Sequence, residues 1–199
     1  CTAPACPTTD ISVIKTVNKT TMNCGALPDT LEYTVKWING GPSAANGITI
    51  MEFFDVIGTV TGGGNASYAF PMSIFGEVWT ASPGSSVLTD TLSHQPILYN
   101  GGGLTYIATQ GFTVPIWEAG DTITLSFKFR IGVPTITGCG RNLSLNFRNN
   151  AYFTIPSNIT LIDTVSTNNS SVTTSTILNI SAVDLSISKS VSPAILNDG

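Results

Sequence analysis

The sequence offers few side chains that could perform catalysis. Its single histidine, His94, lies in a polar stretch, and no nucleophile or acid stands at a spacing that would complete a catalytic triad with it. Glu52 and Asp55 flank two phenylalanines, but residues three apart in a strand point to opposite faces, so the two carboxylates do not suit paired acid–base chemistry on a sugar. We therefore expect no enzymatic activity and assign no catalytic residue.

Metal binding is also weakly signalled. A calcium loop needs several acidic residues within about a dozen positions, and the twelve Asp and Glu residues are spread along the chain. The cysteine spacing C-x4-C, followed by two isolated cysteines, does not match a zinc finger. No cofactor is predicted, and one structural calcium held by separate loops stays as an alternative.

Glycan attachment is the stronger chemical signal. The pattern Asn-X-Ser/Thr gives the N-glycan candidates Asn18, Asn65, Asn142, Asn158, Asn168, Asn169 and Asn179. Asp-Thr before an aliphatic residue resembles the O-glycan acceptor motif of Bacteroidetes-type surface proteins and gives the candidates Thr30, Thr91, Thr122 and Thr164. The alternatives are chance, in a chain this rich in Ser, Thr and Asn, and ordinary turn chemistry for Asp-Thr.

Four cysteines, Cys1, Cys6, Cys24 and Cys139, favour an oxidising compartment and two disulfides. Three pairings are open. We expect Cys1–Cys6 as a local clamp and Cys24–Cys139 as a link that closes a loop of more than a hundred residues. A lipid anchor is an alternative role for Cys1.

Two tryptophans, Trp79 and Trp117, are candidates for ligand contact, because an indole ring can stack on a sugar. They lie at the edges of the least regular part of the sequence. Trp37 instead alternates with apolar residues and is expected in the core. A core position is the alternative for Trp79 and Trp117 as well.

The composition indicates a folded, secreted chain. Of 199 residues, 42% are hydrophobic and only 10% are charged, whereas a disordered chain has the opposite balance. The chain contains 28 Thr, 20 Ser and 15 Asn, which hydrate the surface in place of charge. With a net charge of −4 and eight scattered Lys and Arg residues, nucleic-acid binding is not expected. No membrane span is expected either.

Alternation of apolar and polar residues predicts strands throughout. The clearest run is Thr122–Ile131, and others are 11–17, 31–38, 48–57, 143–147, 151–155 and 173–180. By contrast, the segment from about 58 to 112 lacks a regular period and contains two triple glycines, so it is predicted to be an irregular insertion. An insertion of this kind is where a special function is expected.

The sequence contains an internal repeat. Residues 10–25 align without a gap to 184–199 at an offset of 174, and six of the sixteen positions are identical. One is a lysine, Lys15 in the first copy and Lys189 in the second. We therefore divide the chain into an N-terminal linker (1–9), one module (10–183) and the opening strand of a second module (184–199).

The same residues resemble a known family, the repeat called domain of unknown function eleven. The similar segments are Asp10–Val17, Leu31–Ser43, Gly47–Asp55, Glu118–Leu125 and Asn146–Ala151. The resemblance fails over about 58–112. It implies an immunoglobulin-like module of bacterial or archaeal surface proteins, used as a spacer, stalk, adhesin or filament unit. It does not name a ligand.

The strand at 184–199 needs a partner, because an unpaired strand exposes a row of backbone donors and acceptors. The chain can continue into a next module, or the strand can insert into a neighbouring copy and extend a head-to-tail polymer. The assembly strand residues are Asp184, Leu185, Ile187, Lys189 and Val191. Both alternatives make copies or modules of this same protein its partners.

Together these observations predict an all-β chain, an immunoglobulin-like Greek-key β-sandwich with an irregular insertion and an extra C-terminal strand. The expected function is a structural repeat unit of an extracellular surface fibre or giant adhesin, joined head to tail through 184–191. The alternative is an adhesin module that binds surface glycans through the 58–112 insertion.

Overall fold

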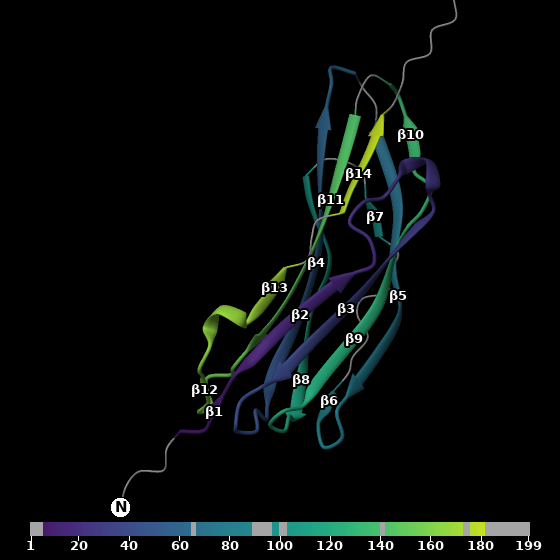
Figure 1. Cartoon of the computed structure of the whole chain (residues 1–199). Coiled ribbons are helices and arrows are strands. Elements are labelled where there is room, and N and C mark those ends of the chain that lie inside the picture. Colours follow the sequence, from purple (N-terminus) through teal and green to yellow (C-terminus); the bar gives the residue numbers. More distant parts are fainter. Residues whose placement is uncertain are drawn as a thin grey trace, which may run out of the picture.

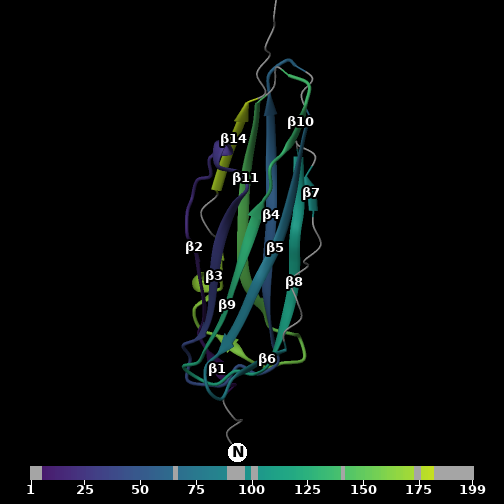
Figure 2. The same ribbon diagram turned by 90° about the vertical axis from the view of Figure 1, so that its right-hand side faces the viewer.

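A computed structural model describes residues 6–64, 67–88, 97–99, 103–139, 142–172 and 176–181. In this part of the chain almost all regular structure is β-strand, arranged in two six-stranded sheets that pack on each other as a sandwich (Figure 1; Figure 2). The expectation of an all-β sandwich is confirmed at this level.

The first sheet has the strand order β10-β5-β9-β3-β2, and β7 also pairs with β5. All of its pairings are antiparallel. Its strands are β2 (Ile11–Val17), β3 (Asp29–Asn39), β5 (Ser67–Ala81), β7 (Ile97–Tyr99), β9 (Thr122–Ile131) and β10 (Thr135–Thr137).

The second sheet has the order β13-β11-β4-β8-β6, and β14 also pairs with β11. Its strands are β4 (Ile48–Thr61), β6 (Ser86–Leu88), β8 (Gly103–Ile116), β11 (Asn142–Thr154), β13 (Ser170–Val172) and β14 (Thr176–Ser181). A short parallel pair, β1 (Thr8–Thr9) with β12 (Ile162–Asp163), and two single-turn 3-10 helices, η1 (Cys24–Ala26) and η2 (Ser166–Asn168), complete the described elements.

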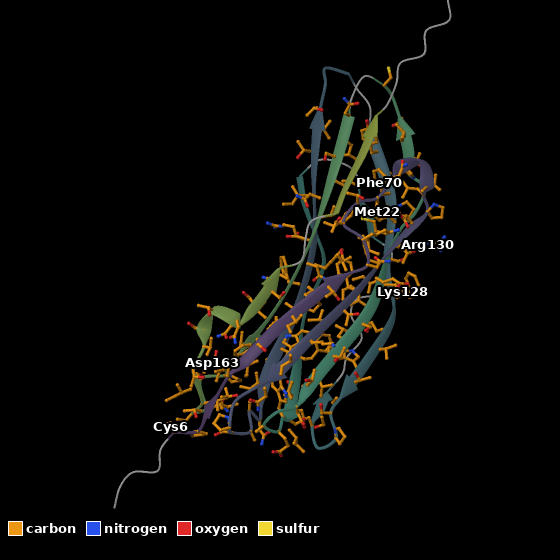
Figure 3. The ribbon with its side chains drawn as sticks, in the orientation of Figure 1. Cys6, Met22, Phe70, Lys128, Arg130 and Asp163 are labelled. Carbon is orange, nitrogen blue, oxygen red and sulfur yellow. The ribbon has the colours of Figure 1, made fainter. Side chains whose placement is uncertain are left out.

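Period-two alternation explains why these segments form half-buried strands. In β9, Ile123, Leu125, Phe127, Phe129 and Ile131 are at most 1% exposed, and the intervening residues face outward. Figure 3 shows Lys128 and Arg130 along the outer side of this strand. The alternation that predicted the strand therefore also predicted its buried face.

Aromatic rings from both sheets meet in the core. Phe54 of β4 lies edge-on to Tyr33 of β3, with ring centroids 5.4 Å apart, and 4.6 Å from Phe129 of β9. Phe129 in turn lies 5.5 Å from Phe147 of β11. Because these contacts cross between the sheets, they hold the two layers in one packing arrangement.

The predicted irregular insertion at 58–112 is wrong for the part that the structure describes. The end of β4, the whole of β5 and most of β8 lie in this range, and these long strands belong to the two main sheets. Bulges hid them from a search for alternation. The register of β5 shifts between Phe75 and Val78, where Gly76 has φ +65°, and that of β4 and β8 shifts at Phe54/Asp55.

A second difference concerns β11. Two strands were predicted at 143–147 and 151–155, but one continuous strand, Asn142–Thr154, pairs along its whole length with β4. The intervening Arg148, Asn149 and Asn150 are polar, which interrupted the apolar pattern without interrupting the strand. The side chains of Arg148 and Asn149 have separate roles, described below.

The chain enters and leaves the sandwich at opposite ends. β1 and the start of β2 lie at the lower end in Figure 1, and β14 finishes at the upper end. Backbone pairing agrees with this, because Ile11 pairs with Asn39 near one end, and Ser181 and Thr61 both pair with Asn142 near the other.

The side chain of Asn39 joins several segments of the chain by hydrogen bonds at the end of the sandwich where β2 begins. Its side-chain oxygen accepts hydrogen bonds from the Thr9 hydroxyl and the Gly41 N–H. Its amide nitrogen donates to the backbone carbonyls of Ser43, Trp117 and Glu118 at 3.0–3.3 Å. The turn that follows requires glycine at position 41, because a Cβ there would lie 2.3 Å from the Cα of Thr9.

We predict that Asn39→Ala lowers the free energy of unfolding by about 3 kcal/mol, because several buried polar groups lose their partner at once. Urea denaturation measures the change. The exposed Asn158 provides the matched control, and Asn158→Ala should change stability by less than about 0.5 kcal/mol. Equal effects of the two substitutions would contradict this role of Asn39.

Candidate functional site

A buried polar cluster of Lys15, Glu52 and Asn149 stands out in the sandwich interior. Lys15 comes from β2 in the first sheet, whereas Glu52 of β4 and Asn149 of β11 come from the second. The side chains of Lys15 and Glu52 are 0% exposed, and Asn149 is 0% exposed as a whole residue. Charged side chains are rarely buried so completely, so this cluster is the candidate site.

The three side chains are in direct contact. Lys15 Nζ lies 2.8 Å from Glu52 Oε1 and 3.0 Å from Oε2, so it donates to both carboxylate oxygens. The same nitrogen contacts the side-chain carbonyl oxygen of Asn149. Lys15 and Asn149 are 134 residues apart in sequence, so only the folded sandwich brings them together.

Strand register explains how the second sheet presents its two members. Glu52 lies opposite Ala151, and Asn149 lies opposite Phe54, so Glu52 and Asn149 are diagonal neighbours on the inner face. On β2, Lys15 shares the inward face with Ile11 and Val13. It therefore reaches across the sandwich from the edge strand of the first sheet.

The surroundings of the cluster are apolar. The inward neighbours of Glu52 along β4 are Ile50 and Phe54, and those of Asn149 along β11 are Phe147 and Ala151, all completely buried. Water is therefore kept from the amine, the carboxyl and the amide, and their mutual interactions are strong.

Burial shifts both titratable groups toward their neutral forms. It lowers the pKa of Lys15 from 10.5 to about 8, although the charge of Glu52 and a hydrogen bond to it act in the opposite direction. It raises the pKa of Glu52 above its ordinary value, and this rise is opposed by the charge of Lys15 and by hydrogen bonds with Lys15 and Asn149. The site thus holds an amine with a lowered pKa, a carboxyl with a raised pKa, and a side-chain amide.

Sequence analysis did not select this cluster. Glu52 was considered only together with Asp55, and the two do point to opposite faces. Asp55 instead accepts a bidentate pair from Arg148 of the neighbouring strand, at 2.9 Å and 2.5 Å. The available signal was Lys15 itself, because alternation places it on the same face as Ile11 and Val13. Its partners could not be found by spacing.

The assembly strand residues predicted between Asp184 and Val191 lie outside the described residues, as do His94, Asn65 and Thr91. The two disulfides stay predictions. Cys1 lies outside the described part, and for Cys24 the structure describes the backbone alone. Cys6 is exposed near the N-terminal end (Figure 3), and Cys139 is half-buried.

Exposure separates the glycan candidates. Asn18, Asn142, Asn158 and Thr164 are exposed, whereas Thr30, Thr122, Asn168 and Asn169 are half-buried. Asn168 donates its amide nitrogen to the Asp10 carboxylate at 2.7 Å, which engages the atom that an N-glycan would need. For Asn179 only the backbone, in β14, is described. Glycosylation at the exposed positions stays a prediction.

The tryptophans belong to the interior. Trp117 is 0% exposed, and its ring nitrogen donates to the Asp121 carbonyl at 3.1 Å, so it has no face for a ligand. Trp79 is partly buried, stacked on Trp37 at 6.1 Å and edge-on to Phe112 at 4.5 Å. Of the two alternatives for these residues, the structure favours the core position.

Two absences hold for the part of the chain that the structure describes. No three His, Cys, Asp or Glu side chains come together there as metal ligands do. Nor does that part of the chain contain a helix long and apolar enough to span a membrane.

Comparisons with known proteins give no family. No family model and no curated protein matches the chain. One solved structure similar to it is that of AvmM, which catalyses macrocyclization in alchivemycin A biosynthesis. The alignment covers 91% of this chain and 94% of that one at 8% identity, with a TM-score of 0.33. A likeness this weak carries no argument about function.

We predict that the free energy of unfolding rises with pH in the Asn149→Ala variant, which keeps the Lys15–Glu52 pair but lacks the amide that contacts the amine. Between about pH 8, the pKa of Lys15 in the folded chain, and 10.5, its ordinary value, the unfolded chain binds more protons. Folding therefore becomes more favourable as pH rises through this window. Urea denaturation at each pH gives the free energy of unfolding.

The matched control for this measurement carries Lys15→Met and Glu52→Gln in the same Asn149→Ala background, which removes both titrations. The difference in stability between the two variants should grow in favour of the lysine-containing chain as pH rises from 8 to 10.5. Parallel pH profiles would show that burial does not lower the pKa of Lys15.

Proposed function

We propose that this chain is a structural unit of an extracellular surface fibre or giant adhesin of a bacterium or archaeon, with an immunoglobulin-like Greek-key sandwich as its fold. The observation that carries the proposal is the path of the chain, which enters the sandwich at one end and leaves at the other (Figure 1). A module with its ends at opposite poles can be joined end to end, and tension then runs along its strands.

The repeat supports this arrangement. A second copy of the opening strand, 184–199, follows the module in sequence, so the next unit begins where this one finishes. The joint is formed either by continuation into that unit or by donation of the strand at 184–191 to a neighbouring copy. In both cases the partner is the same kind of module.

The low charge and the glycan acceptor patterns of the chain are consistent with an extracellular location. Charged residues make up only 10% of the chain, and exposed asparagines such as Asn18, Asn142 and Asn158 stand in glycan acceptor patterns. Attached glycans would hydrate a surface that carries little charge. Disulfides and an oxidising compartment belong to the same proposal.

The alternative, a glycan-binding adhesin module acting through 58–112, has less support. The described strands of that range build the two sheets, and Trp117 is completely buried. The structural function is therefore preferred.

We predict that protease treatment of intact cells of the source organism releases peptides from this chain, because the module lies outside the cell envelope. Mass spectrometry of the supernatant identifies the peptides, and a cytosolic protein that stays intact is the control. Recovery of the chain solely after lysis would contradict the proposed function.

Deletion of 184–199 distinguishes the two kinds of joint. If the strand is donated, the full chain assembles into filaments and the shortened chain stays as separate units, which electron microscopy and light scattering detect. If the chain continues, neither form assembles, and the denatured, reduced and deglycosylated protein from the native source is much heavier than 20.8 kDa. Filaments formed equally by both chains would rule out donation of this strand.

A further inference from the structure

We propose that Lys15 and Asn149 become joined by an isopeptide bond, which the folded chain forms by itself with Glu52 as the catalytic proton-transfer residue. The bond would link β2 of the first sheet covalently to β11 of the second. The inference rests on the chemistry of the buried cluster and not on where the module works, so it stands or falls separately from the proposed function.

The fold holds the reacting groups in contact. An amine and a carboxamide react extremely slowly in water, but a folded protein that holds them in contact replaces a bimolecular encounter by an intramolecular one. Lys15 Nζ contacts the side-chain carbonyl of Asn149, whose Cγ is the atom to be attacked. Both side chains project inward from hydrogen-bonded strands, since β2 is paired with β3 and β11 is paired along its whole length with β4.

The pKa shifts of Lys15 and Glu52 also suit the reaction. An ammonium ion is not a nucleophile, so the reaction requires neutral Lys15 and a group that can move protons. Burial lowers the pKa of Lys15 to about 8, which makes the neutral amine accessible near neutral pH. Burial raises the pKa of Glu52 above its ordinary value, which favours transfer of a proton from the lysine to this carboxyl.

The reaction balances without any other reactant. A proton passes from the Lys15 ammonium to Glu52, and the lone pair of Nζ attacks Cγ of Asn149. As the Nζ–Cγ bond forms, Glu52 delivers its proton to the side-chain nitrogen of Asn149 and then takes one further proton from Nζ, so that the carboxyl ends protonated. The Cγ–Nδ2 bond then breaks and ammonia leaves. The side-chain amide of Asn149 is thereby replaced by the amide that joins it to Lys15. No oxidant, metal or cofactor is consumed.

An ion pair between Lys15 and Glu52 does not by itself account for the position of Asn149. The Lys15 amine and the Glu52 carboxylate already bond each other at 2.8 and 3.0 Å. A completely buried amide added beside them costs free energy of desolvation that an apolar side chain would not. An amide in contact with the amine is what the reaction requires. The repeat is consistent with this, since Lys189 stands at the position equivalent to Lys15.

The chain also contains a charge pair of the same types in a different setting. Lys128 of β9 lies 3.0 Å from Glu32 of β3, and both side chains are about half exposed. Figure 3 shows Lys128 on the outer side of its strand. Because solvent reaches both groups there, this pair lacks the buried setting of the cluster and serves as an internal control.

The test is the intact mass of the full chain, produced without glycans, denatured and reduced. We expect a mass lower than that of the sequence by one ammonia molecule. Digestion should yield a branched peptide that joins the segment around Lys15 to the segment around Asn149, and fragmentation should locate the bond at these two residues. An intact mass equal to that of the sequence, or a branch at other residues, would overturn the proposal.

Matched variants assign the roles. The loss of ammonia should be abolished by each of three substitutions, Lys15→Met, Asn149→Ala and Glu52→Gln. In Glu52→Gln the amine and the amide are both still present, so its effect reports the proton-transfer role of Glu52. Asn150→Ala, at the neighbouring asparagine of β11, and Lys128→Met should keep it. Loss of ammonia in Asn149→Ala would refute the assignment.

The proposal can be tested even if a Glu52 variant does not fold. If Glu52→Gln fails to fold, the branched peptide of the unsubstituted chain still establishes the bond. Folding the unsubstituted chain from a freshly synthesised, denatured sample, in which the bond has not yet formed, then shows when it forms. The ammonia loss should appear after folding and not in denaturant. Ammonia loss at the same rate in denaturant would contradict a reaction that needs the folded site.

Discussion

The contact of Lys15 with Glu52 is the constraint on which much of the sandwich depends. An amine and a carboxyl have been taken out of water between the sheets, and removing either one would leave the other buried without its partner. The contact therefore requires β2, β4 and β11 to stay in one register. A slip of β2 by one residue would turn Lys15 to solvent and bring Ile14, now 49% exposed, inward.

The position of this contact matters for a module under tension. β2 opens the sandwich at one end, and β11 pairs with β14, which finishes at the other end. A covalent link between Lys15 and Asn149 would carry force directly from the first strand to the last part of the chain. The 134-residue separation between them would then be a closed loop outside the path of the force. By analogy with a disulfide across a loop of this length, such a link also stabilises the fold by roughly 5 kcal/mol.

Much of the fold was readable from the sequence because most strands are amphipathic. The alternation of Thr122–Ile131 and of Leu31–Trp37 identified both the strands and their buried faces. It failed for β5 and β8, where bulges near Gly76 and Phe54 break the period, and for β11, where polar residues occupy the middle of the strand. The inward position of Lys15 could be read in the same way, but Glu52 and Asn149 could not, because their proximity depends on pairing between distant strands.

Mechanical unfolding of the full chain, pulled from its two ends, tests the account most directly. The length of chain that is released reports both the covalent link and the path of the force. The account predicts that unfolding releases only the chain outside the Lys15–Asn149 loop. With disulfides reduced, the Asn149→Ala variant should release additional length, roughly 480 Å at about 3.6 Å per residue over the 134-residue separation. If the unsubstituted chain extends as far as the variant, the strands are not joined and the account is wrong.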